Sequence, residues 1–97
     1  MLLELGIGDA YGAGREFAPA EDVAANNDGK TYVQNPVHED LKPGRYTDDT
    51  QMSIAVAEWM LSGDKTTLSL AHRFVTTFKR DQRPGYASRF YELLKNV

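Results

Sequence analysis

The sequence predicts an all-α fold in a single domain that spans residues 1–97. Apolar residues between positions 48 and 61 recur at spacings of three and four, which is the period of an amphipathic helix. No segment shows sustained alternation of apolar and polar residues, and only the short stretch 31–33 has some strand character. A chain of 97 residues has room for one hydrophobic core, so we expect one small domain.

Two helical segments are expected in the first part of the chain. Apolar residues are dense enough over 2–11 for a buried helix, although Gly6 and Gly8 each cost it about 1 kcal/mol relative to alanine. These glycines have two readings, close packing against another helix or room for a ligand beside the backbone. A proline and early acidic residues predict a short helical turn over 19–25. Turn-forming residues then predict a long surface loop over 26–46.

Three further helices are expected after this loop. The strongest signal begins at Asp48 or Asp49 and runs to residue 61, with an apolar stripe formed by Met52, Ala55, Val56, Trp59 and Met60. The next helix begins near residues 64–67 and ends at residues 79–80, where two basic side chains suit the helix dipole. Its expected inward side chains are Leu68, Ala71, Phe74, Val75 and Phe78. A last helix is expected over residues 88–96.

The composition argues against several classes of protein and site. Lysine and arginine total 11 against 14 aspartate and glutamate residues, and no basic run occurs, so we expect no nucleic-acid partner. No stretch of about 18 apolar residues is present, which predicts a soluble, cytoplasmic protein without a membrane partner. The chain has no cysteine, so a metal would bind oxygen or imidazole. The two histidines, His38 and His72, are each expected to be ordinary side chains rather than ligands.

Thr47, Asp48 and Asp49 form the most informative cluster, where the loop meets the strongest predicted helix. One interpretation is capping, because oxygens at a helix start accept backbone N–H bonds and the helix dipole stabilises acidic groups. The other is a site for magnesium or manganese, which prefer carboxylate, hydroxyl and water oxygens. Two adjacent carboxylates also repel each other, and a bound dication would relieve that repulsion.

Two motifs resemble those of the ADP-ribosylglycohydrolase family. Residues 8–12, Gly-Asp-Ala-Tyr-Gly, followed by Glu16 and Phe17, are similar to the signature of the family's first helix. Residues 44–52, Gly-Arg-Tyr-Thr-Asp-Asp-Thr-Gln-Met, are similar to its second motif, and the order and separation of the two agree. Phe74 and residues 84–86, Pro-Gly-Tyr, are similar to its third region, so the resemblance spans essentially the whole chain.

The resemblance implies an orthogonal all-helical domain like the N-terminal part of this fold, and a hydrolase that removes ADP-ribose from a protein side chain or small molecule. It implies two magnesium or manganese ions in the complete site, with Thr47, Asp48 and Asp49 as metal ligands. Asp48, Asp49 and Glu16 are the implied catalytic residues, and Glu16 would gate the site or handle protons. Asp9 lies in the first motif and has two readings, structural or catalytic.

The chain departs from the family in its length. Family enzymes are several-fold longer, and a C-terminal Asp-x-Asp-Thr segment, absent from residues 1–97, supplies their remaining metal ligands. A working hydrolase would need a further region, a second chain or a homo-oligomer to complete the site. One alternative is a non-catalytic module that binds ADP-ribose, a similar nucleotide or a protein. Another is a structural role, as in the lens crystallins of this fold, although Asp48 and Asp49 argue against it.

Overall fold

The computed structural model describes residues 1–97 and contains five α-helices and no strand, which confirms the predicted all-α class. The helices are α1 (Leu2–Ala13), α2 (Ala20–Asn26), α3 (Asp48–Leu61), α4 (Thr67–Arg80) and α5 (Ser88–Asn96). The stretch 31–33 is not a strand and belongs to the loop between α2 and α3. None of the helices has the length and apolar character that a membrane span requires.

The helix bounds follow from local sequence signals. The first helix extends two residues beyond its predicted end, to Ala13. Pro19 is the N-cap of α2 and adopts an extended conformation, so this helix begins one residue later than predicted. Thr66 caps α4, because its hydroxyl accepts the backbone N–H of Ser69 at 3.1 Å. The bounds of α3 and α5 agree with the prediction.

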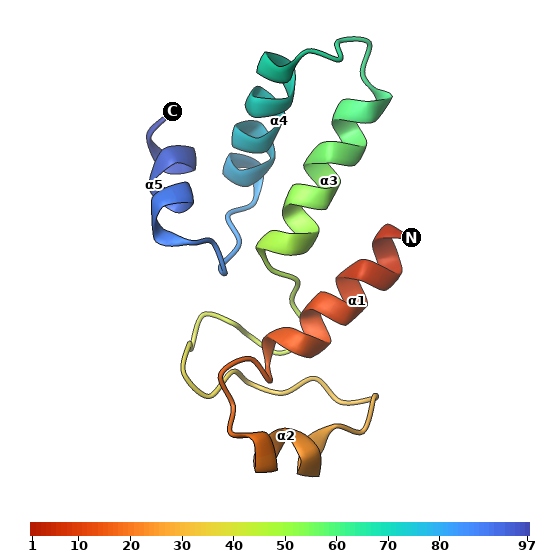
Figure 1. Cartoon of the computed structure of the whole chain (residues 1–97), viewed down its shortest axis with the longest axis vertical. Helices are drawn as coiled ribbons and strands as arrows, with labels where there is room; N and C mark the ends of the chain where they lie inside the picture. The colour runs from red at the N-terminus through yellow and green to blue at the C-terminus, as the bar shows by residue number, and fades with distance from the viewer.

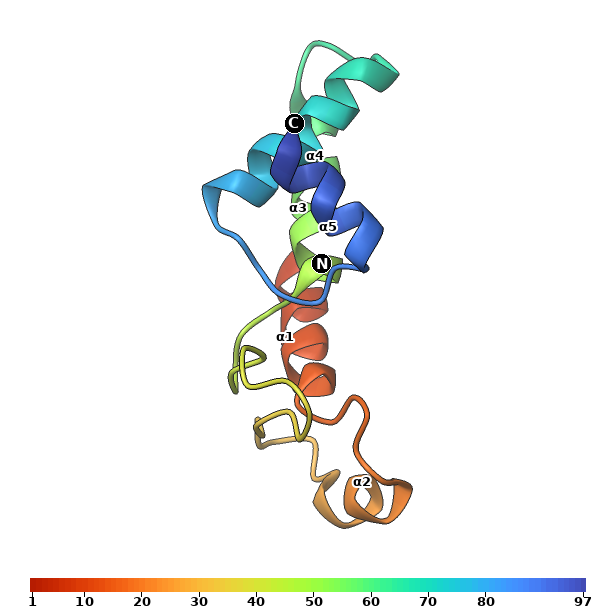
Figure 2. The same ribbon diagram turned by 90° about the vertical axis from the view of Figure 1, so that its left-hand side faces the viewer.

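The helices are arranged so that α3 and α4 form an antiparallel pair at one end of the molecule (Figure 1). Among the helices, α5 packs only on α4 and α1 packs only on α3. The short helix α2 touches no other helix and lies with the long loop at the opposite end, as the turned view also shows (Figure 2). The molecule is therefore elongated, with extents of 47 × 28 × 18 Å.

The largest buried apolar side chains lie around α4, which packs between α3 and α5. Ala55 and Phe78 are fully buried, and Leu94 is 1% exposed. The ring of Phe78 packs edge-to-face on Tyr86, with centroids 5.2 Å apart, and on Tyr91 at 5.8 Å. Such aromatic pairs stabilise a core beyond the area they bury. This cluster fixes the segment between α4 and α5 on the rest of the molecule.

Several apolar side chains that the helical pattern predicts to be inward are exposed. Met60 is 62% exposed and Leu68 is 68% exposed, and Ala71 is exposed as well. These residues lie toward the connection between α3 and α4, away from the half of α4 that α5 covers (Figure 1). Because only two helices meet at that end, part of each apolar stripe faces solvent.

The apolar side chains of α1 are also more exposed than the sequence predicts. Only Ala10 and Ala13 of this helix are buried, whereas Leu3 is 73% exposed and Ile7 is 49% exposed. The reason is that α3 is the one helix that packs against α1. Several large apolar side chains of α1 therefore remain uncovered in this chain.

A buried glutamine joins α3 to the segment that follows α4. Gln51 is 1% exposed, and its Nε2 donates to the carbonyl oxygens of Thr77 at 3.1 Å and Asp81 at 2.5 Å. Its Oε1 accepts a hydrogen bond from the Tyr86 hydroxyl at 2.6 Å. Buried polar groups need such partners, so this network specifies one arrangement. It fixes residues 81–86 beside the start of α3.

The long loop is attached to the end of α1 by two buried polar side chains. Arg15 donates to the carbonyl oxygens of Asn26 at 2.7 Å and Thr31 at 2.9 Å. Asn35, which is 3% exposed, donates to the carbonyl oxygen of Glu16 at 2.9 Å. The predicted surface loop is therefore irregular, but hydrogen bonds attach it to the rest of the molecule at defined points.

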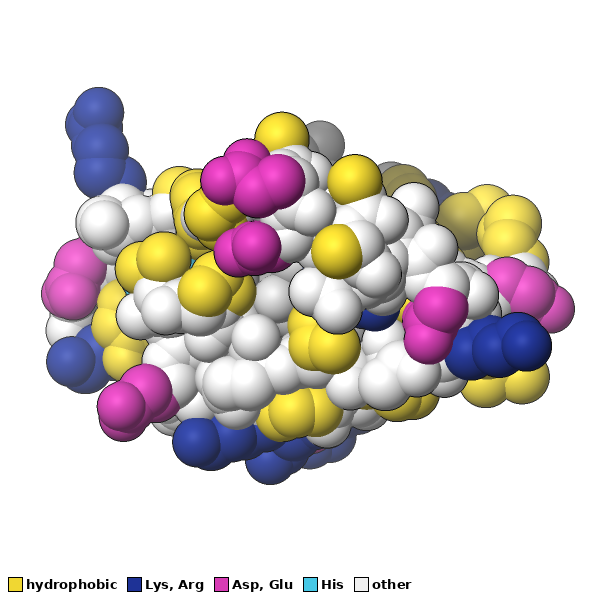
Figure 3. Space-filling model, turned by 90° about the horizontal axis from the view of Figure 1, so that it is seen from below, with side chains coloured by type: hydrophobic (Ala, Val, Ile, Leu, Met, Phe, Trp, Pro, Cys, Tyr) yellow, Lys and Arg dark blue, Asp and Glu magenta, His cyan; other side chains and the backbone are white.

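The loop end of the molecule also exposes apolar side chains. Phe17, Tyr32 and Val37 are each at least 40% exposed. Seen from below, hydrophobic side chains form several separate patches with acidic side chains between them (Figure 3). Lysine and arginine side chains lie mostly at the margins of this face.

Candidate functional site

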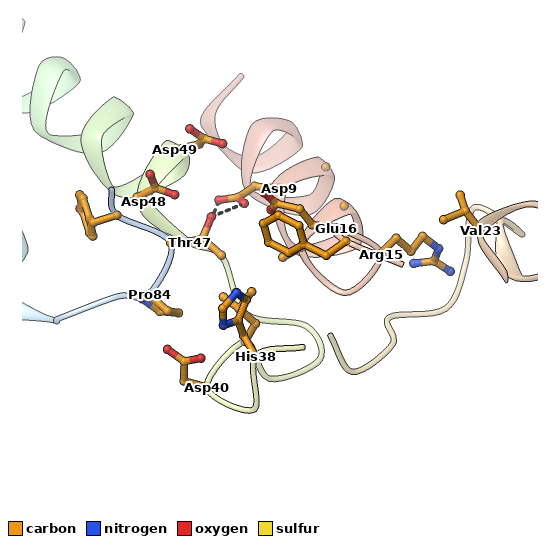
Figure 4. A pocket seen from close by; sticks show the side chains of 17 residues that line it. Asp9, Arg15, Glu16, Val23, His38, Asp40, Thr47, Asp48, Asp49 and Pro84 are labelled. Carbon is orange, nitrogen blue, oxygen red and sulfur yellow. Dashed lines mark hydrogen bonds between the residues drawn. The ribbon is translucent and has the colours of Figure 1, made fainter. Parts of the chain in front are cut away.

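The start of α3 is held by a carboxylate that belongs to α1. Asp9 Oδ2 accepts the backbone N–H of Thr47 at 2.8 Å, the backbone N–H of Thr50 at 3.3 Å and the Thr50 hydroxyl at 2.7 Å. Asp9 Oδ1 accepts the Thr47 hydroxyl at 2.6 Å, and Figure 4 shows this link between the two elements. Thr47 is the N-cap residue, yet its side chain makes no capping bond. Asp9 therefore caps α3 from another helix.

Capping was one of the two interpretations of Thr47, Asp48 and Asp49; the Thr47 side chain makes no capping bond, and Asp9 accepts the N–H groups of Thr47 and Thr50. No local pattern in the sequence links Asp9 to a helix start that lies 38 residues away in the chain. In the sequence, only the position of Asp9 within the first motif suggests that it has a role. Of its two readings, the structural one is now supported by four hydrogen bonds.

The aspartates of this site differ in their electrostatics. Burial raises the pKa of Asp9, but the hydrogen bonds from Thr47 and Thr50 outweigh it and hold that pKa below its usual value. Burial, together with the charge of neighbouring Asp49, raises the pKa of half-buried Asp48. Asp49 is exposed. A cation beside Asp48 and Asp49 would relieve their repulsion, and both carboxylates lie at the positive end of the α3 dipole.

The Pro-Gly segment after α4 closes on Asp48. The backbone N–H of Asp48 donates to the carbonyl oxygen of Pro84 at 3.1 Å. Gly85 has a φ of +107°, and a Cβ there would lie 2.5 Å from Oδ1 of Asp48. Only glycine fits this position without moving the carboxylate. The Pro-Gly dipeptide signals a turn in the sequence, but its contact with Asp48 is visible only in the structure.

An open cleft of about 920 Å³ lies beside these residues, and Glu16 and Asp9 line it together with residues 47–49 and 84–86. Gly8 also lines the cleft, and nothing lies within 4 Å of the place that a Cβ would take there. This position therefore favours the reading of Gly8 as room for a ligand. At Gly6, in contrast, a Cβ would lie 3.6 Å from Thr50 Cγ2, an ordinary contact distance.

The two histidines lie in different places. His38 lines the cleft, where its ring packs edge-to-face on Phe17 with centroids 5.5 Å apart. Phe17 has a positive φ of 69° and its side chain is 63% exposed. His72 lies on α4 and does not line the cleft. In Figure 4, the Arg15 side chain points away from the aspartates, so the cleft has no basic group beside Asp48.

The chemistry of Thr47, Asp48 and Asp49 fits magnesium or manganese, because all three offer hard oxygen ligands. Three candidate ligands are few for a metal site, however. Nowhere in the chain do three or more histidine, aspartate or glutamate side chains lie close enough together to hold a metal ion. Thr47, Asp48 and Asp49 by themselves would therefore offer only part of the ligands that such an ion requires.

Comparison with known proteins identifies the class of protein to which this fold and site belong. The family described as ADP-ribosylglycohydrolase matches the chain over residues 1–95. The chain therefore belongs to the ADP-ribosylglycohydrolase family, as the sequence motifs predict. It is similar to the ADP-ribosylarginine hydrolase Tri1 of Serratia proteamaculans (strain 568), with 28% identity over 92 residues. That match covers 95% of this chain and 24% of Tri1, so the chain spans about a quarter of its relative. No solved structure matches the chain.

Proposed function

We propose that this chain provides the N-terminal part of a metal-dependent hydrolase that releases ADP-ribose from a modified protein side chain or a small molecule. Membership of the ADP-ribosylglycohydrolase family supports this proposal. The name of Tri1 specifies ADP-ribosylarginine, so arginine-linked ADP-ribose is the first substrate to assay. A further polypeptide region, a second chain or a second copy of this chain would complete the site.

The capping of α3 by Asp9 is the observation that carries the proposal. Asp9 accepts the backbone N–H of Thr50 and the Pro84 carbonyl accepts that of Asp48, so neither of these bonds at the helix start uses the carboxylate of Asp48 or Asp49. In this proposal Thr47, Asp48 and Asp49 bind one side of a pair of magnesium or manganese ions. When bound, the ions supply Lewis-acid stabilisation of developing charge and hold ribose hydroxyls and water in position.

Glu16 is proposed to orient the attacking water or to accept its proton. Its side chain is exposed and lines the same cleft as Asp48 and Asp49. Asn35 holds the backbone of Glu16 through the hydrogen bond to its carbonyl oxygen, so the carboxylate extends from a fixed point. A carboxylate in that position serves as a general base if water comes within hydrogen-bond reach.

The exposed apolar side chains of α1 support the view that more polypeptide completes the site. Leu2, Leu3, Leu5 and Ile7 are all more than a third exposed on this helix. Several large exposed apolar side chains on one helix mark a place where another element packs. The same helix carries Asp9 and lines the cleft, so the added element would lie close to the site.

The test measures ADP-ribose release from arginine-ADP-ribosylated protein by the purified chain, with magnesium or manganese present. The decisive variant is Asp48→Ala/Asp49→Ala. Glu21→Ala/Asp22→Ala is its matched control, because those two exposed acids also occupy the first turn of a helix. Metal-dependent release that the first variant loses and the control keeps would support the hydrolase. Failure of the wild-type chain to bind manganese, measured by paramagnetic line broadening, would refute the proposal.

A second candidate function is non-catalytic binding of ADP-ribose or a related nucleotide. The small ligand set favours it, because no three acidic or histidine side chains of this chain converge on one ion. A binder would retain ADP-ribose in titration calorimetry without releasing it from modified protein. Binding that survives Asp48→Ala/Asp49→Ala would place the nucleotide elsewhere in the cleft and exclude the metal from its recognition.

A further inference from the structure

The further inference concerns the direction of the hydrogen bond between Thr47 and Asp9. A hydroxyl group carries one proton and two lone pairs, whereas an ionised carboxylate can only accept hydrogen bonds. In the 2.6 Å contact between Thr47 Oγ1 and Asp9 Oδ1, the threonine must therefore be the donor. Both lone pairs of Thr47 are left for other partners.

The other oxygen of Asp9 makes this orientation stable. Asp9 Oδ2 accepts three hydrogen bonds, from two backbone amides and the Thr50 hydroxyl. The carboxylate is thus fixed in its plane, and Oδ1 is presented to Thr47 alone. Thr47 itself is 6% exposed and its side chain makes no capping bond. The neighbouring Asp48 carboxylate also interacts with its hydroxyl, and the 2.6 Å bond to Asp9 directs the proton toward Asp9.

We propose that Asp9 is a positioning residue for the metal site: it accepts the hydrogen bond of the Thr47 hydroxyl and so leaves the threonine lone pairs to face the ion. Groups that hydrogen-bond to metal ligands in this way fix their orientation and increase their basicity. The inference rests on the proposed function, because it requires Thr47 to be a ligand. It assigns Asp9 a role beyond capping, although Asp9 does not itself touch the ion.

The decisive variant is Asp9→Asn, which keeps the shape of the side chain but replaces one oxygen with an amide group. Three donors face Oδ2, so the amide oxygen must turn toward them and the NH₂ group must face Thr47. That NH₂ then donates to Thr47 Oγ1, occupies a lone pair and turns the hydroxyl proton away. Thr50→Val is the matched control, because it removes a hydroxyl bound to the same carboxylate that is not a proposed ligand.

Manganese affinity, followed by paramagnetic broadening of NMR signals from residues 47–50, is the readout. We expect Asp9→Asn and Thr47→Val each to weaken binding about 10–100-fold. The Asp9→Asn/Thr47→Val double variant should bind manganese no more weakly than either single variant, because both changes remove the same contribution to the affinity. Thr47→Ser should retain the affinity, and Thr50→Val should lower stability while changing the affinity little.

If Asp9→Asn lowers the melting temperature but binds manganese as the wild type does, Asp9 is only a cap and the inference fails while the proposed function stands. If the wild type binds no manganese, the proposed function fails and the inference falls with it. A second measurement needs no variant at Asp9. The Thr47 hydroxyl proton of the wild type should exchange slowly with and without magnesium, and rapid exchange in both conditions would overturn the inference.

Discussion

Replacing Gly85 with alanine should damage the candidate site more than alanine at Gly29 or Gly63. Gly85 has a φ of +107°, and a Cβ there would lie 2.5 Å from Oδ1 of Asp48. Backbone strain of this kind costs about 1–3 kcal/mol, and displacement of the carboxylate adds to it. Each kcal/mol lowers the melting temperature of a domain of this size by about 4–8 °C. We therefore expect Gly85→Ala to lower the melting temperature by roughly 4–24 °C.

Thermal unfolding followed by circular dichroism tests this expectation, with two other glycines as controls. Gly29 has a φ of +72° and nothing within 4 Å of its Cβ position, so Gly29→Ala introduces strain without a collision. Gly63→Ala introduces neither. The loss in Gly85→Ala beyond that in Gly29→Ala measures the contacts with Asp48 and Thr47, and adding Asp48→Ala should recover the Asp48 part. A melting temperature equal to that of Gly63→Ala would refute the account of this turn.

Three further expectations follow from other positions. Gly8→Ala should raise the free energy of unfolding by about 0.5–1 kcal/mol in denaturant titrations, because it removes a helix glycine that faces open space. Lower stability would show that this position is packed. Gln51→Leu should lower the free energy of unfolding by about 1–3 kcal/mol, because two buried carbonyl oxygens and the Tyr86 hydroxyl lose their partner; an unchanged denaturation midpoint would contradict this. Hydrogen bonds from Thr31 lower the pKa of Asp28 to about 2, below the unfolded value of about 3.9. Their stabilisation is therefore present above about pH 4 and lost as the pH falls toward 2. NMR titration should show the low midpoint in the wild type and a higher one in Thr31→Val.

Local periodicity was sufficient to predict the helices. Residues 48–61 and 88–96 repeat at helical spacing and are bounded by clear signals, so their bounds agree with the structure. Burial was harder to predict, because it depends on which neighbours cover a helix. Met60 and Leu68 fit the apolar pattern of their helices, but no third helix lies over that end of the pair.

The candidate site was predictable only in part. The motifs identified the family and placed Thr47, Asp48 and Asp49 at a helix start, where the structure has them. Their role as metal ligands stays a prediction. The capping bonds of Asp9 and the approach of Gly85 to Asp48 join segments distant in the chain, so no local pattern reveals them.

The chain has a single tryptophan, so its fluorescence reports on one end of α3 without a signal from the candidate site at the other end. The indole N–H of Trp59 donates to the Ser69 hydroxyl at 3.0 Å and to the carbonyl oxygen of Thr66 at 3.2 Å. All three residues lie near the connection between α3 and α4, at the opposite end of α3 from Asp48. The emission of Trp59 therefore reports on the connection between α3 and α4. An emission change when manganese is added would mean that α3 transmits binding along its whole length to α4.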